Sequence, residues 1–427
     1  MRDYLVLAII LAGIPISFMR PYYGILFWSW VGYMNPHRLT WGIAYNFPAA
    51  LVIGVSTLLG FFFTRNRTSL PRERETYLLL ALWALFILTT TVALNPDDAW
   101  PQLERVSKIL LMTMITMMVI TTRKQLRWFL LVIALSIGYF GVKGGIFSLR
   151  GGGADRVYGP PGSFLEDNND LGLAIVMVLP VMFFMALEES KKWFRYLLFA
   201  TGLLSITTVV FTYSRGAFVG LAAVGATALL KSKRKLLGFL VIAFALVMGT
   251  SLIPDRWFAR MATIGDVTEG SAAGRINAWH FAWNLASAQF PIGGGFETFT
   301  PTLFLRYAPN PLDFHAAHSI YFQMIGDQGA IGIVLFLSML ISTLWSLQRL
   351  RNRFRKVPSL QWISRYATML QISLVGYMSS GAFLGRAYFD LAYHLIASAI
   401  LLKVFARREL MAMASGDAEP AVKEIAA

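Results

Sequence analysis

Long hydrophobic runs, separated by short polar or basic segments, dominate the pattern along the chain. Residues 77–94 (YLLLALWALFILTTTVAL) carry no charge over 18 positions, the length at which a membrane-spanning helix is the expected structure. Such runs recur over most of the sequence, so we predict an all-α, polytopic membrane protein. Spans are expected near residues 45–63, 76–93, 108–121, 128–147, 168–187, 194–211, 215–231, 236–253, 319–347, 366–385 and 388–405.

The first 35 residues add either one broken span or two short ones. Pro21 interrupts this run after Arg20, because proline cannot donate a helical hydrogen bond. The total is therefore 12 or 13, and we predict about 12 transmembrane helices. The predicted parts are an N-terminal transmembrane bundle (1–253), a large outer loop (254–318), C-terminal transmembrane helices (319–410) and a disordered cytoplasmic tail (411–427).

The large loop 254–318 is rich in aromatic residues, which a simple linker would not need. Residues 275–288 (RINAWHFAWNLASA) also place apolar side chains near helical spacing. A long loop with structure of its own is commonly functional. We therefore predict a small helical cap that lies on the outer face of the membrane.

Composition narrows the class of protein further. Of the 427 residues, 56% are hydrophobic and 14% are charged, whereas soluble domains carry roughly 25% charged residues. Mean hydropathy is +0.57 and the chain has no cysteine. These values exclude a soluble enzyme, a disordered chain and a disulfide-stabilised secreted scaffold.

The 38 basic and 23 acidic residues leave a net charge of +15. In a soluble protein this excess would suggest nucleic acid as a partner, but here the positions of the charges decide. More than half of the basic residues stand in six clusters. These clusters alternate with segments that lack such clusters, which is the positive-inside pattern and also favours anionic lipid. We expect membrane lipid and no nucleic acid as partners. The clusters, predicted to be cytoplasmic, are residues 65–74, 123–127, 191–195, 231–235, 349–365 and 403–408.

Two histidines end the large loop. His318 directly precedes the span 319–347, at the outer mouth of the membrane, where a neutral imidazole could accept a proton from a hydroxyl. An interfacial histidine with only local hydrogen bonds would give the same pattern. His315 is a secondary candidate; the two histidines could supply two zinc ligands, but few acids and no cysteine stand near to complete the set, so we expect no metal.

Two arginines are candidates for binding phosphate. Arg215 opens the span 215–231 after a tight outer turn, where a helix N-terminus and a guanidinium can bind an anion together. The alternative is an arginine that extends to the membrane surface, although the positive-inside rule makes it less expected on the outer side. Arg275, in the large loop, is either a second phosphate ligand or the partner of Asp266 or Glu269.

Turn-forming residues fill the segment 151–170 (GGGADRVYGPPGSFLEDNND), whose acidic end can cap the next helix. Arg156 and Tyr158 in this segment are secondary candidates that could complete a basic cluster. The adjacent Asp97 and Asp98 resemble the acidic pair of a metal-dependent glycosyltransferase. We favour helix capping for this pair, because two carboxylates in a short loop are a weak metal signal.

Four segments occur in an order that resembles the O-antigen ligase and polymerase superfamily. They are GPPGSFLEDNN, YSRGAF, GRINAW with PIGGGFETF, and AHSIYFQMIGDQGAIG. The resemblance covers roughly residues 130–345, about half of the chain. It is strongest to the ligases, including those described as exosortase-associated O-glycosylation ligases. The sequence departs from many members at Ser319, where they carry asparagine.

The resemblance implies a GT-C-like glycosyltransferase of lipopolysaccharide biosynthesis in the bacterial inner membrane. It would transfer a polysaccharide from undecaprenyl diphosphate to a sugar hydroxyl of lipid A–core on the periplasmic side, without metal or cofactor and with inversion. His318 matches the family's essential histidine, and Arg215 and Arg275 match its diphosphate-binding arginines. A polymerase, a protein O-oligosaccharyltransferase and a transporter of lipid-linked glycan are the alternatives.

Overall fold

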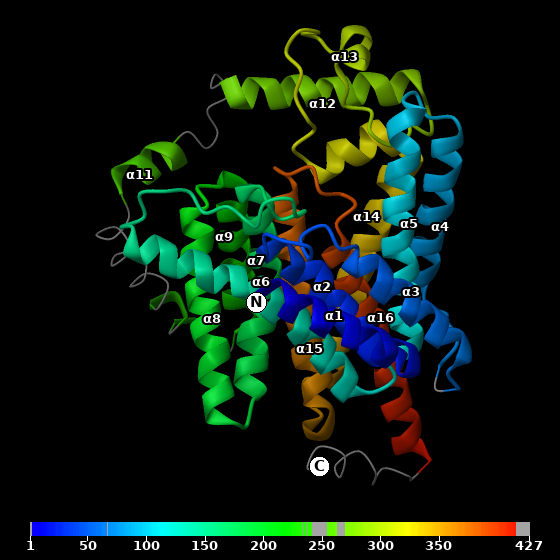
Figure 1. The fold of residues 1–427 in the computed structure, drawn as a ribbon, viewed down its shortest axis with the longest axis vertical. Coiled ribbons are helices and arrows are strands. Elements are labelled where there is room, and N and C mark those ends of the chain that lie inside the picture. Colours follow the sequence, from blue (N-terminus) through cyan, green and yellow to red (C-terminus); the bar gives the residue numbers. More distant parts are fainter. Residues whose placement is uncertain are drawn as a thin grey trace.

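A computed structural model describes residues 2–65, 67–232, 234–236, 238–240, 254–262 and 270–415. All regular elements among these residues are helices (Figure 1). They are α1 (Arg2–Met19), α2 (Pro21–Met34), η1 (Pro36–Leu39), α3 (Ala49–Phe63), α4 (Arg74–Thr91), α5 (Pro96–Val119), α6 (Arg123–Arg150), α7 (Asn168–Glu188), α8 (Lys192–Phe211), α9 (Arg215–Lys231), α11 (Asp255–Ala262), α12 (Gly270–Ala288), α13 (Pro301–Tyr307), α14 (Ile320–Phe354), η2 (Pro358–Leu360), α15 (Gln361–Gly381) and α16 (Asp390–Ala414).

Among the described helices, five are long and apolar enough to cross a membrane: α1, α6, α7, α8 and α14. Helix α3 is apolar but shorter. Helices α4, α5, α9, α15 and α16 lie on other predicted spans without meeting the same criterion. The count of about twelve spans therefore stays a prediction. The predicted span 236–253 falls largely outside the described residues. The predicted tail 411–427 begins as helix, because α16 continues to Ala414, and the residues after Ser415 lie outside the described residues.

The structure adds detail to the sequence prediction at the starts of two helices, α2 and α5. Arg20 separates α1 from α2, and Pro21 is the first residue of α2, where its missing N–H is tolerated. Helix α5 begins at Pro96, well before the predicted span that starts at 108. Asp97 and Asp98 occupy its first turn, where their negative charges interact favourably with the positive end of the helix dipole. The acidic pair is therefore part of a helix start.

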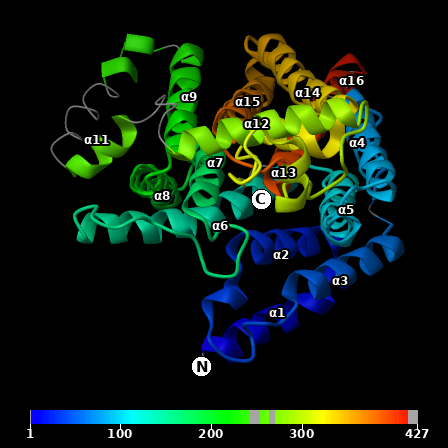
Figure 2. The ribbon, with the colours of Figure 1, turned by 90° about the horizontal axis from the view of Figure 1, so that it is seen from above.

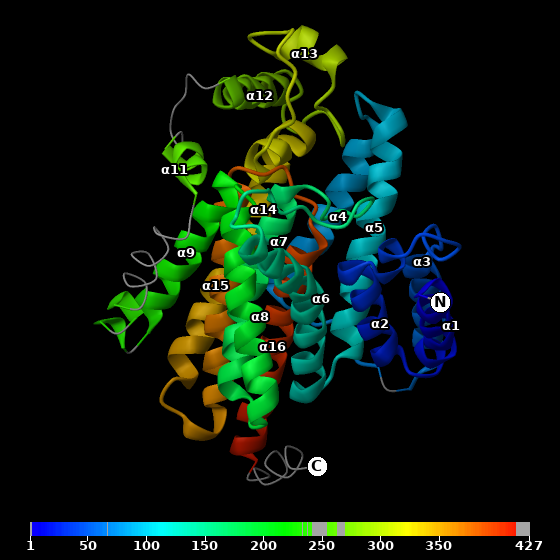
Figure 3. The same cartoon turned by 60° about the vertical axis from the view of Figure 1, so that its left-hand side comes forward.

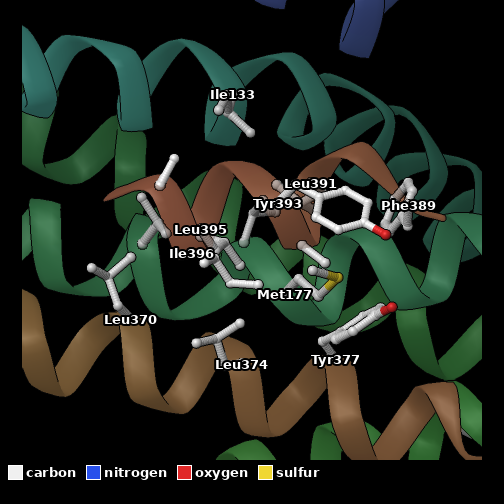
Figure 4. Close-up of a cluster of buried hydrophobic side chains, with 14 of the residues drawn as sticks. Ile133, Met177, Leu370, Leu374, Tyr377, Phe389, Leu391, Tyr393, Leu395 and Ile396 are labelled. Atoms are coloured by element: carbon white, nitrogen blue, oxygen red, sulfur yellow. The ribbon is translucent and has the colours of Figure 1, made fainter. Parts of the chain in front are cut away.

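Helix α16 packs against α5, α14 and α15, and Figure 4 shows its buried side chains near those of α6, α7 and α15. All residues of α16 from Leu391 to Leu402 are buried, and 83% of the apolar window of α7 is buried as well. A helix that is hydrophobic all round is stable only when neighbours cover every face. The core cluster includes Ile133, Met177, Leu370, Leu374, Leu391, Tyr393, Leu395 and Ile396.

The loops gather at two ends of the bundle. One end carries α12 and α13 together with the loops 92–95, 151–167, 212–214 and 382–389, and we call it the α12 end (Figures 1 and 3). The opposite end carries the basic segments. There Glu73 forms ion pairs with Lys403 at 2.8 Å and with Arg407 at 2.7 Å.

The α12 end is joined to α14 through glycine backbone. The amide of Gly294 donates to the carbonyl of Gly326 at 3.0 Å, and Gly295 donates to Asp327 at 2.8 Å. Helix α14 is broken at Gly329, whose φ of 63° and ψ of −159° lie in a region that only glycine adopts readily. A Cβ atom at Gly329 would stand 2.4 Å from the amide nitrogen of Gly293. Close backbone packing thus fixes where the loop 289–300 leaves the bundle.

We expect Gly329→Ala to destabilise the protein by about 1–3 kcal/mol, the usual cost of such a backbone conformation in a residue with a side chain. Thermal unfolding in detergent would show a lower Tm. Gly225→Ala is the matched control, because a Cβ there meets nothing within 4 Å. A helical alanine at that position should raise the Tm slightly. Equal Tm values for the wild type and Gly329→Ala would contradict the packing described.

Candidate functional site at the α12 end

The loop 382–389, between α15 and α16, lies among the polar residues of the α12 end. Arg386 binds Asp170 at the start of α7 through two hydrogen bonds, one of them 2.6 Å from Nε to Oδ1. It also donates to the carbonyl of Phe164 at 3.3 Å. A bidentate guanidinium–carboxylate pair fixes geometry well. Arg386 thereby anchors this loop to α7 and to the turn-rich segment before it.

His318 stands immediately before α14, with Ser319 as the N-cap residue. Its φ of 42° is left-handed, an uncommon conformation for a residue other than glycine. The neighbouring carbonyl of Ala317 accepts a 2.9 Å hydrogen bond from Nε1 of Trp279 in α12. A Cβ built on Gly385 would lie 3.6 Å from the backbone nitrogen of His318. Helix α12 and the loop 382–389 therefore both border this backbone.

The surroundings of His318 keep its imidazole neutral. Burial lowers the pKa of His318, and the positive charge of Arg275 and the nearby His315 lower this pKa further. Asp167 acts in the opposite direction. Because the ordinary value is near 6.5, an imidazole with a lowered pKa is unprotonated at pH 7. It can accept a proton, as a general base must.

Helix α12 carries Arg275 and packs against the loop that carries His315, near His318. Gly274 leaves room for the His315 ring, since a Cβ there would stand 2.4 Å from its Cε1 atom. Nδ1 of His315 lies 3.1 Å from a carboxylate oxygen of Asp313. Asn277 holds the loop by donating to the carbonyls of Asn310 and Asp313. The alternative partners predicted for Arg275, Asp266 and Glu269, lie outside the described residues.

Arg215 is the first residue of α9, as the sequence predicts, and Ser214 caps the helix by accepting from the amide of Ala217. Arg215 is half-buried. Its neighbour Gly216 packs closely on the loop 382–389, because a Cβ there would lie 3.0 Å from Cβ of Phe383. The start of α9 and His318 thus border the same loop.

Arg156 and Tyr158 are exposed. Between them, the amide of Val157 donates to the carbonyl of Phe211 at 3.0 Å. This contact holds the backbone between the two residues against the end of α8, just before the turn 212–214. Arg275 and His315 both act on His318.

Sequence reasoning missed Arg386. A signal was available, because Arg386 is a basic residue in a tight turn that was predicted to lie on the outer side, the argument that singled out Arg215. Among the described residues, no three His, Cys, Asp or Glu side chains form a group able to hold a metal ion.

We expect Arg275→Ala to raise the pKa of His318, because it removes a positive charge that disfavours the imidazolium. The acidic limb of the pH–activity profile should then move to higher pH. The matched control is Arg306→Ala, which removes an exposed guanidinium from α13. An unmoved acidic limb in Arg275→Ala would show that this charge does not act on His318.

The fold and the polar end define a helical membrane protein with a candidate site at one end of its bundle. Residues 200–337 match the O-antigen ligase family, and this match supports membership of the O-antigen ligase superfamily. Arg215, Arg275 and His318 all lie in the matched segment. Residues 1–190 match a family of unknown function, DUF5935. No curated protein matches the chain.

Members of the O-antigen ligase family are glycosyltransferase-like ligases, which supports an enzymatic role for this chain in O-antigen-related processes. The family also implies lipid-linked polysaccharide and lipid A–core as the general classes of substrate. The match reaches the end of the first half of α14 and leaves out the loop with Arg386.

Proposed function

We propose that the protein is an O-antigen ligase. It transfers a polysaccharide from undecaprenyl diphosphate to a sugar hydroxyl of lipid A–core, at the periplasmic face of the bacterial inner membrane. The observation that carries the proposal is that Arg215, Arg275 and His318 all lie in the segment that matches the ligase family. The charge of Arg275 also acts on His318 and lowers the pKa of its imidazole.

In this reaction His318 accepts the proton of the acceptor hydroxyl as its oxygen attacks the anomeric carbon of the donor sugar. The bond between that carbon and the diphosphate oxygen breaks, and undecaprenyl diphosphate leaves with the electron pair. Direct displacement inverts the anomeric carbon. Arg215 and Arg275 hold the diphosphate and stabilise the charge that develops on it. Two guanidinium groups supply the compensating positive charge, so the proposal includes neither metal nor cofactor.

A transporter of lipid-linked glycan would need polar groups along a path through the membrane. Here the polar residues of the candidate site gather at the α12 end, and the middle of the bundle is packed with apolar side chains. This distribution favours chemistry at a membrane surface over transport through it.

The acceptor decides between a ligase and its relatives in the superfamily. Purified protein would be given undecaprenyl-diphosphate-linked glycan with lipid A–core, a second repeat unit or a protein acceptor. We expect glycan on lipid A–core with the wild type and none with His318→Ala. Transfer only to a repeat unit would instead identify a polymerase, and transfer only to protein an O-oligosaccharyltransferase.

A further inference from the structure

A second polar region lies at the opposite end of the bundle, away from the candidate site. It is a cavity of about 1150 Å³ between the α1–α2 junction, the end of α3 and the turn from α5 to α6. All its lining residues fall between Met19 and Trp128. It therefore belongs to the segment that matches the family of unknown function, and it shares no residue with the ligase match.

The cavity is cationic. Arg20, Arg67 and Lys124 line it and are exposed, and none of the described residues that line it is acidic. Threonine and tyrosine hydroxyls, among them Thr122 and Tyr23, add hydrogen-bonding groups to the wall. Three cations with hydroxyl donors form a suitable environment for a phosphate group.

The surroundings of the cavity are suited to lipid. Met19 and Phe63 are each 76% exposed, and Trp128 is 46% exposed. They adjoin or line the cavity at the ends of α1, α3 and the α5–α6 turn. Only 17% of the apolar window in α1 is buried, so most of this helix surface is available to acyl chains. A soluble phosphate compound would gain nothing from such a surface.

We propose that this cavity binds the phosphate headgroup of an anionic phospholipid, with its acyl chains along α1 and α3. Figure 2 shows α1, α2 and α3 grouped on one side of the bundle, next to α5 and α6. The charge pattern predicts that this end faces the cytoplasmic leaflet, where anionic headgroups attract basic residues. The site is separate from the proposed donor site and does not depend on the proposed reaction.

Native mass spectrometry of the full chain in detergent tests the proposal with phosphatidylglycerol and phosphatidylcholine as probes. We expect the wild type to retain phosphatidylglycerol preferentially. The double variant Arg20→Gln/Lys124→Gln should lose roughly 30-fold in affinity for this lipid, if each basic residue contributes as is usual near a membrane surface. The matched control Arg355→Gln/Lys356→Gln removes two exposed charges from the loop after α14 and should bind as the wild type does.

The proposal is overturned if the control variant Arg355→Gln/Lys356→Gln loses as much affinity for phosphatidylglycerol as the double variant in the cavity. Non-specific electrostatic attraction between the protein and the lipid would then explain the binding. Equal retention of phosphatidylcholine would also overturn it. Release of phosphatidylglycerol by a similar concentration of glycerol phosphate would point to a soluble phosphate compound. The variant Arg20→Lys/Lys124→Arg keeps both charges and should keep the binding. Its failure to bind, with an intact fold by size-exclusion chromatography, would contradict a charge-based site.

Discussion

His318→Ala is expected to lower glycan transfer by about 10²–10⁴-fold, the usual contribution of a positioned general base. Binding of the undecaprenyl-diphosphate donor should stay close to that of the wild type, because the variant keeps both arginines. The physical reason is that the variant loses the imidazole to which the proposal assigns the hydroxyl proton. Transfer rates and donor affinity would be measured on the same preparation.

His280→Ala is the matched control for this variant. His280 lies on α12 with an exposed side chain, and transfer should be unchanged when this side chain is removed. His315→Ala separates the two histidines of the loop, because the proposal assigns proton transfer to His318. Wild-type transfer by His318→Ala, or a larger loss in His315→Ala, would contradict the assignment.

Arg215→Ala is expected to lower transfer by about 10²–10³-fold, which is the usual loss when one preorganised donor to a developing negative charge is removed. Affinity for undecaprenyl diphosphate should fall as well. Arg215→Lys should recover only part of the loss, because an ammonium cannot bind phosphate through two parallel hydrogen bonds. Transfer and donor affinity would be measured together.

The control for Arg215 is Arg150→Ala, since Arg150 is exposed at the end of α6. It removes the same charge without touching the proposed diphosphate site. If Arg215→Ala binds undecaprenyl diphosphate with unchanged affinity, Arg215 has no role in holding the donor.

Local features of the fold follow from the sequence. Ser214 and Arg215 mark the start of α9 because a serine cap acts within one turn. The helix predicted from residue 275 is present and begins earlier, at Gly270. Its apolar spacing is a property of the segment alone. The break in α14 at Gly329 is different, because it depends on the approach of Gly293 from another loop.

In the candidate site, too, some features can be predicted from short sequence motifs and others depend on long-range packing. His318, Arg215 and Arg275 stand in short motifs, so their residue types and positions in the sequence are enough to suggest chemistry. The pair of Arg386 with Asp170 joins residues that are 216 positions apart. Neither residue carries a local signal for the other, and only the packing of α15 against α7 brings them together. Long-range ion pairs of this kind cannot be predicted from one sequence.

In the proposed reaction, glycan transfer and release of the lipid carrier are one event. This coupling is tested by measuring the undecaprenyl diphosphate released and the lipid A–core glycosylated in the same reaction with purified protein. We expect equal amounts of the two products with the wild type, and about 10²–10⁴-fold less of both with His318→Ala. If the donor is recovered intact in the presence of the acceptor, and no undecaprenyl diphosphate is formed, the proposed reaction is wrong.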